Sequence, residues 1–209
     1  MSFITARRAA ALALVAASIT LGACDKKGEG TQMMLSPAQS AFKNTDVTGL
    51  DYAKDFAMPD HTGKMRTLAD FKGKAVVVFF GYTQCPDVCP TTMSEMANVM
   101  QQLGPMSDKV QVLFVTVDPE RDTPELLSTY VPAFDQRFLG LVGDKAATEK
   151  MAKEFRVFYQ KVQGKEPGSY TMDHTAGSYV FDPQGRLRLF VRHGQGPEPI
   201  AHDLKLLLS

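Results

Sequence analysis

A six-residue apolar segment, residues 75–80, leads directly into a turn that carries two cysteines. A short continuous apolar run followed by glycine is typical of a strand buried on both faces. Pro86 disfavours a helical conformation for Cys85, and Pro90 is well suited to the first turn of a helix. The sequence therefore predicts a buried strand, an extended loop holding Cys85, and a helix over residues 90–103 with Cys89 as its N-cap.

The two thiols lie four positions apart on this strand-to-helix turn, which we expect to be exposed. Free N–H groups and the helix dipole favour a thiolate at the N-terminus of a helix, so Cys89 is expected to be activated. Such a pair is suited to redox chemistry or to binding a soft metal such as copper or zinc. A structural disulfide across so short a loop would add only about 2 kcal/mol.

Two sulfurs are too few for a closed zinc site or a common iron–sulfur cluster, so a metal site would need a further ligand. The chain offers four histidines: His61, His174, His193 and His202. His174 lies in a segment, residues 170–177, that we predict to be a loop. Asp173 precedes it and is a candidate for orienting the ring, as carboxylates beside metal-binding histidines do. The residue pattern alone does not choose among the four.

The rest of the chain alternates strand and helix patterns. The predicted elements are a hairpin over 56–68, strands at 110–117, 139–142 and 156–163, helices at 123–133, 144–155 and 199–208, and a terminal hairpin at 177–191. This order predicts an α/β protein with a mixed central sheet, flanking helices and an N-terminal hairpin. With the dithiol at the end of a buried strand, it resembles a thioredoxin-like fold, although three residues rather than two separate the cysteines.

The N-terminus has the pattern of a targeting segment. Arg7 and Arg8 precede an apolar run over residues 9–21, and Leu-Gly-Ala-Cys24 follows. The run is short for a membrane span and is typical of a signal peptide over residues 1–24. Its end resembles the lipobox of bacterial lipoproteins, in which Cys24 is acylated after cleavage. Ordinary cleavage and an uncleaved anchor are the alternatives.

The segment after the signal is polar and without periodicity. Residues 25–49 are predicted to be a flexible tether that reaches about 25–30 Å, and residues 50–209 to be the folded domain. With an acylated Cys24, and with Asp25 resembling an inner-membrane retention residue, we expect the domain to lie on the periplasmic face of a bacterial inner membrane.

Charge and motif content exclude several functions. The chain has 23 basic and 23 acidic residues, which gives no electrostatic reason to propose a nucleic-acid partner. It has no signature of a serine nucleophile, a phosphate-cradling loop or a dinucleotide site. The sequence therefore favours a binding protein over a conventional enzyme.

Three stretches closely resemble the signatures of the Sco/SenC family, which are copper-binding proteins for cytochrome c oxidase assembly. The stretches are GYTQCPDVCP at 81–90, VDPERDTP at 117–124 and DHTAGS at 173–178. The resemblance runs from about Leu50 to the C-terminus with all three stretches in order. The anchor differs, because many members of the family have a transmembrane helix.

The resemblance implies a thioredoxin-like domain that binds one copper ion, as Cu(I) or Cu(II), through Cys85, Cys89 and His174. It also implies that Asp118 lies near the site. The expected role is to deliver copper to the dinuclear copper centre of cytochrome c oxidase subunit II. Other periplasmic copper chaperones and thiol reductants are further expected partners.

Two other functions remain open from the sequence. Cys85 and Cys89 would be the redox pair of a thiol–disulfide oxidoreductase or a peroxiredoxin-like enzyme acting on exported cysteines, which has no need of His174. A copper-responsive sensor would use the same three residues without delivering the metal.

Overall fold

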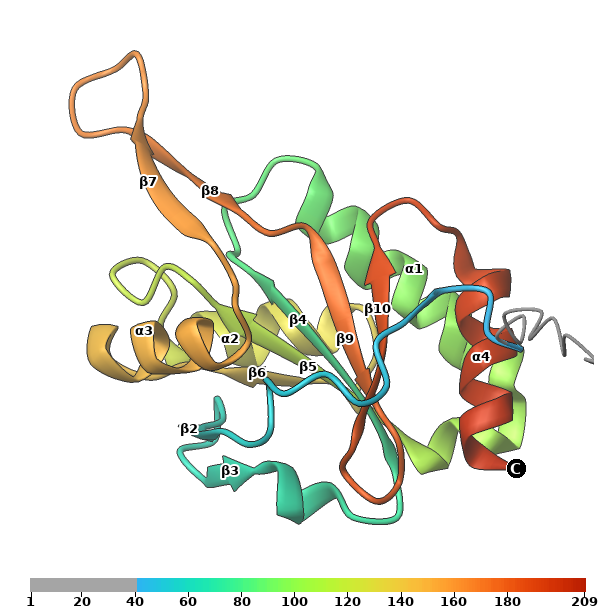
Figure 1. Cartoon of the computed structure of the whole chain (residues 1–209). Helices are drawn as coiled ribbons and strands as arrows, with labels where there is room; N and C mark the ends of the chain where they lie inside the picture. Colours follow the sequence, from blue (N-terminus) through green and yellow to red (C-terminus); the bar gives the residue numbers. More distant parts are fainter. Residues whose placement is uncertain (1–40) are drawn as a thin grey trace, which may run out of the picture. The chain divides into compact units, whose positions relative to one another are not determined.

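The computed structural model describes residues 41–209 (Figure 1). The predicted signal peptide, Cys24 and most of the predicted tether lie outside the described residues.

A six-stranded mixed sheet forms the centre of the domain (Figure 1). Its strands, in spatial order, are β1 (Thr45–Asp46), β10 (Leu187–Arg192), β9 (Gly177–Phe181), β4 (Ala75–Gly81), β5 (Val110–Thr116) and β6 (Leu139–Leu141). β4 is parallel to β5 and antiparallel to β9, and β5 is parallel to β6. The predicted mixed sheet of a thioredoxin-like fold is confirmed.

Both faces of the two central strands are covered. Every residue of β4 and of β5 is buried, which explains why neither strand shows an alternation of apolar and polar residues. Successive side chains point to opposite faces. Phe79 contacts Phe114 on one face, and Phe80 contacts Phe155 on the other.

Within residues 41–209, four helices flank this sheet. They are α1 (Val88–Leu103), α2 (Pro124–Tyr130), α3 (Lys145–Glu154) and α4 (Pro197–Leu208). α1 and α4 pack against each other on one side of the sheet (Figure 1), and Phe155 at the C-terminal end of α3 packs beneath Phe80 on the opposite side. The caps predicted for α2 and α3 are confirmed, because Thr123 and Asp144 each accept a backbone N–H of the first turn.

In the described part of the chain, two small hairpins lie outside the central sheet. The predicted N-terminal hairpin is formed by β2 (Ala57–Pro59) and β3 (Met65–Thr67). The second is formed by β7 (Tyr159–Gln163) and β8 (Tyr170–His174), and it projects away from the body of the domain (Figure 1). Short 3₁₀ segments cover Leu68–Phe71, Gly104–Lys109 and Val131–Ala133.

The structure corrects several boundaries. α1 begins at Val88, so Cys89 lies inside its first turn and Asp87 is the N-cap. Pro90 is tolerated there because the N–H groups of the first turn have no acceptor within the helix. The first hydrogen bond of the helix runs from the Thr91 N–H to the Asp87 carbonyl. The second helix ends at Tyr130, before Pro132, and continues as a 3₁₀ turn.

Three strands of the described residues, β1, β7 and β8, differ from the sequence prediction. Residues 170–174, predicted to be a loop, form β8, and the strand predicted from Arg156 begins only at Tyr159. Thr45 and Asp46 pair with β10, so the sheet includes residues that the sequence assigned to the tether. Two paired residues are too short a segment to show a periodic pattern.

No helix within residues 41–209 combines the length and the apolar character needed to cross a bilayer.

Candidate metal centre

The cysteine loop begins where two parallel strands end. Gly81 closes β4 beside Thr116 at the end of β5, so the loops that follow both strands meet at one edge of the sheet. A side chain at residue 81 would not fit, because an added Cβ would lie 2.9 Å from the Cys89 sulfur and from the rings of Phe79 and Phe114. The glycine therefore lets the helix that carries Cys89 pack directly on the strand.

Cys85 and Cys89 face each other across the start of α1. The backbone N–H of Cys89 lies 3.3 Å from the Cys85 sulfur and donates to it. In the part of the chain that the structure describes, both cysteines are free thiols. Cys89 is fully buried and Cys85 is half-buried, so the pair is less exposed than the sequence predicted.

His174 reaches the sulfurs because of the register of the central sheet. Ser178 of β9 pairs with Phe79 of β4, which places the start of β9 beside the end of β4. β8 ends three residues earlier, at His174. The imidazole packs edge-on against the rings of Phe79 and Tyr82, with a centroid distance of 6.1 Å in each case.

The hydrogen bonds of the imidazole fix its orientation. Nδ1 lies 3.1 Å from the carbonyl oxygen of Thr175, a pairing that places the proton on Nδ1. The other nitrogen, Nε2, is then an acceptor and lies 3.5 Å from the Cys89 sulfur. Thr175 itself is held by the backbone of Phe158, since its N–H donates to the Phe158 carbonyl at 2.9 Å. A lone pair of His174 thus faces the thiols.

Three donor atoms therefore converge. The two sulfurs and a ring nitrogen of His174 all lie within 4.8 Å of one another. Atoms that bind one ion at about 2.0–2.3 Å are separated by about 4 Å, so a small contraction would close the site. Thiolate and imidazole ligands suit Cu(I) and zinc, and three of them leave room for a fourth ligand.

Burial sets the protonation of two of these groups. Burial raises the pKa of the Cys89 thiol far above its ordinary value, and the neighbouring Cys85 acts in the same direction. The expected activation of Cys89 at the helix N-terminus is therefore not found, because burial disfavours the charged thiolate. Burial also lowers the pKa of His174, which keeps the ring neutral and able to bind a metal.

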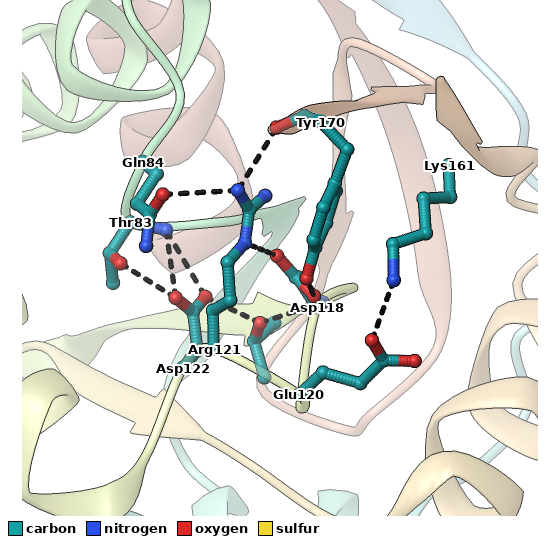
Figure 2. A network of polar contacts seen from close by, with 9 residues as sticks. Thr83, Gln84, Asp118, Glu120, Arg121, Asp122, Lys161 and Tyr170 are labelled. Carbon is teal, nitrogen blue, oxygen red and sulfur yellow. Dashed lines mark hydrogen bonds and ion pairs between the residues drawn. The ribbon is translucent and has the colours of Figure 1, made fainter. Parts of the chain in front are cut away.

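Asp118 lies at the edge of the site, within a network of polar contacts (Figure 2). Its side chain is buried, pairs with Arg121 and accepts a hydrogen bond of 2.9 Å from the Tyr170 hydroxyl. Arg121 in turn donates to Gln84, which precedes Cys85. Asp118 is thus linked through Arg121 to the residue that precedes Cys85, and it contacts Tyr170 at the start of β8.

Sequence reasoning missed Asp122. This carboxylate is 1% exposed and accepts hydrogen bonds from the backbone and hydroxyl of Thr83 and from the hydroxyl of Thr116. It ties the start of the cysteine loop to the end of β5. A sequence feature that points to Asp122 was present, because charged residues directly follow β5, a buried strand that runs parallel to β4.

Asp173 is exposed, and the partner of Nδ1 in the structure is the Thr175 carbonyl rather than this carboxylate. The charge of Asp173 acts on His174 by raising its pKa, against the larger effect of burial.

The other three histidines have separate partners. His61 Nδ1 accepts from the Gly140 backbone, His193 pairs with the Thr92 hydroxyl and His202 pairs with Asp203. Only His174 joins the two cysteines in the metal-ligand cluster found within residues 41–209.

The family assignment follows from comparison with known proteins. The family model described as SCO1/SenC matches residues 45–209, which includes the cysteine loop, the Asp118 loop and His174. The chain belongs to the SCO1/SenC family.

Relatives of known structure support the same fold for this SCO1/SenC domain. Bradyrhizobium japonicum ScoI, solved with copper bound, is 44% identical with a TM-score of 0.68, and the match covers 74% of this chain and 98% of that one. Apo Sco1 from Thermus thermophilus is 40% identical with a TM-score of 0.71, covering 81% and 99%.

The mitochondrial SCO2 homologue of Bos taurus is 36% identical over 153 residues. That match covers 72% of this chain but 58% of the relative, so the chain spans less than two thirds of that relative's length.

Proposed function

We propose that this SCO1/SenC protein binds one copper ion through Cys85, Cys89 and His174 and delivers it to the dinuclear copper centre of cytochrome c oxidase subunit II. The observation that carries the proposal is the convergence of the three donor atoms within 4.8 Å. The copper reported in the structure of Bradyrhizobium japonicum ScoI, which is 44% identical, supports the choice of metal.

The geometry suits an ion that is passed on to another protein more than an ion that stays bound. Three soft ligands hold Cu(I) while leaving a position for a donor atom of the receiving protein. Cys85 and His174 are both half-buried rather than sealed, so ligand exchange has access from that side. Because Cys89 is protonated in the metal-free protein, loading releases its proton, and the affinity for copper should rise with pH.

The test is a titration of the reduced domain with Cu(I) against a competing chelator. We expect one ion per chain, and a large loss of affinity in Cys85→Ala, Cys89→Ala and His174→Ala. His202→Ala is the matched control, because its ring pairs with Asp203 instead. Wild-type affinity in His174→Ala would remove His174 from the ligand set.

Delivery needs a separate experiment. Oxidase activity should fall in a strain lacking the gene and return with the wild-type gene but not with His174→Ala. Full activity in the deletion strain at limiting copper would contradict the delivery role.

The proposal includes anchoring through an acylated Cys24 on the periplasmic face of the inner membrane. The full-length protein should appear in the membrane fraction, and Cys24→Ser should shift it to the periplasmic fraction. An unchanged distribution would rule out the lipid anchor.

A thiol–disulfide reductase acting on exported cysteines is the second candidate, favoured by the close approach of two free thiols. The burial of Cys89 leaves the half-buried Cys85 as the accessible sulfur. Rapid reduction of a disulfide substrate by copper-free protein, unchanged in His174→Ala, would favour this function.

A further inference from the structure

Arg121 connects the segment that carries the cysteines to the strand that carries His174. Its Nη1 donates to the side-chain oxygen of Gln84 and to the backbone carbonyl of Tyr170, each at 3.0 Å (Figure 2). Gln84 directly precedes Cys85. Tyr170 is the first residue of β8, and His174 is the last. One guanidinium therefore spans the two parts of the metal centre.

The ring of Tyr170 lies between two cations. The guanidinium carbon of Arg121 lies 3.5 Å from the ring centroid, and Lys161 Nζ lies 3.9 Å from it (Figure 2). The Tyr170 hydroxyl donates to Asp118, and Lys161 pairs with Glu120 at 2.6 Å. Cation–π contacts on both sides, with a hydrogen bond at the tip, fix the ring in position and orientation.

The base of this arrangement is rigid. Asp118 is 3% exposed, pairs with Arg121, and is held by a hydrogen bond from its own N–H to Thr116 at the end of β5. Asp122 bonds the same Thr116 hydroxyl and also holds Thr83. Arg121 is therefore attached to the buried end of a central strand.

The hairpin, by contrast, has little buried surface of its own. In β7 only Tyr159 is not exposed, and in β8 only Met172 is fully buried. The contacts of Tyr170 therefore hold the start of β8 against the domain, while the ring contacts of His174 and the hydrogen bond of Thr175 hold its end.

We propose that Arg121 is a positioning residue of the metal centre, which sets the distance between His174 and the two cysteines through Tyr170. This inference rests on the proposed copper site. Arg121 contacts Gln84, which adjoins Cys85, and Tyr170, which begins the strand that ends at His174. Its planar fork makes three directed hydrogen bonds while stacking on a ring. A lysine could not reproduce that geometry.

The experiment is a double-mutant cycle on Cu(I) affinity, measured with a competing chelator on the reduced protein. Arg121→Gln should bind Cu(I) about 10-fold to 100-fold more weakly, the range found when residues that orient metal ligands are removed. Arg121→Lys should give a similar loss. X-ray absorption of the loaded variant should show a weakened imidazole contribution with both sulfurs retained. In the His174→Ala background, Arg121→Gln should have almost no further effect, because the residue acts through that histidine.

Arg66→Gln is the matched control. Both arginine side chains are 19% exposed, each pairs with a buried aspartate, and Arg66 also lies over an aromatic ring, that of Phe71, at 5.8 Å. Arg66→Gln should lose stability to a similar degree and keep the wild-type Cu(I) affinity.

The outcomes separate the two proposals. Wild-type affinity in Arg121→Gln, with a loss in His174→Ala, overturns the role of Arg121 and leaves the copper site intact. Equal losses from Arg121→Gln with and without His174 also overturn it. Wild-type affinity in His174→Ala overturns the ligand set itself. If Arg121→Gln does not fold, Tyr170→Leu takes its place in the same cycle with the same expected results.

Discussion

The two parts of the metal centre are built in opposite ways. The cysteines follow β4, a strand buried at every position, and the carboxylate that holds their loop, Asp122, is 1% exposed. His174 ends a projecting hairpin whose residues are mostly exposed. Cys89 is thus placed by the hydrophobic core. The imidazole is placed by the register of β9, by its ring contacts and by the Thr175 carbonyl, while the contacts of Tyr170 hold the other end of β8.

The segments that carry the ligands therefore differ in how readily they open locally. Local opening occurs preferentially where little apolar surface is buried and where backbone hydrogen bonds face solvent. The hairpin fits that description, and so do the exposed residues Gln84, Pro86 and Asp87 of the cysteine loop, whereas Cys89 is buried in the core. Under the proposed delivery role, His174 and Cys85, which are both half-buried, are the ligands whose movement disturbs the core less than movement of Cys89 would.

The largest expected effect is a loss of stability from a substitution in β4. Phe79→Ala should lower the free energy of unfolding by about 3–5 kcal/mol, because it leaves a cavity among Phe114, His174 and the Cys89 sulfur. Phe158→Ala, on the 59% exposed ring beside the hairpin, should change it by less than about 0.5 kcal/mol. Urea unfolding of both variants measures the contrast, and equal losses would contradict it.

The second largest effect is expected for Asp122→Ala, which should lower the free energy of unfolding by about 2–3 kcal/mol. The backbone and hydroxyl of Thr83 and the hydroxyl of Thr116 would lose their buried acceptor. Asp87→Ala, in the same loop but exposed and without a side-chain capping hydrogen bond, is the control and should cost less than about 1 kcal/mol. A small effect of Asp122→Ala would mean that the loop does not depend on this anchor.

Shortening the turn between β7 and β8 should have a smaller effect on stability. Residues 164 and 169 already pair through an N–H···O bond of 2.8 Å, so Asn-Gly can replace residues 165–168 as a two-residue turn. We expect a stability change below about 1 kcal/mol and unchanged Cu(I) affinity, because the Tyr170 contacts remain. Reduced affinity would show that the tip itself positions His174.

The smallest effect concerns the pH dependence of His174. Burial holds its pKa below the ordinary 6.5, so the unfolded chain takes up this proton at a higher pH than the folded domain does. This difference in pKa has no effect on the free energy of unfolding above pH 6.5. Below that pH it lowers the free energy of unfolding, and the loss grows as the pH drops from 6.5 through the lowered pKa.

An NMR titration of the metal-free protein should place the His174 midpoint below 6.5, and a midpoint above it would contradict the burial of the ring. In Arg121→Gln the midpoint should move back toward 6.5, since a released hairpin exposes the imidazole to water.

The sequence predicted what short-range chemistry controls. The apolar run 75–80 gave a buried strand, Pro86 and Pro90 marked the loop and the helix start within two residues, and Thr123 and Asp144 capped their helices as expected. Each of these signals depends on neighbouring residues along the chain. For the same reason the resemblance of three short stretches was enough to indicate the SCO1/SenC family.

Other features depend on residues far apart in sequence and were decided only by the tertiary structure. Cys89 and His174 are separated by 85 positions, and Arg121 and Tyr170 by 49. The protonation of Cys89 was mispredicted because the helix dipole is local, whereas the burial that opposes it comes from packing against Gly81 and the core. β8 was taken for a loop because its pattern is weak and its stability comes from β7 and from Arg121. Spatial convergence and desolvation are properties of the packed chain, and no stretch of residues carries them by itself.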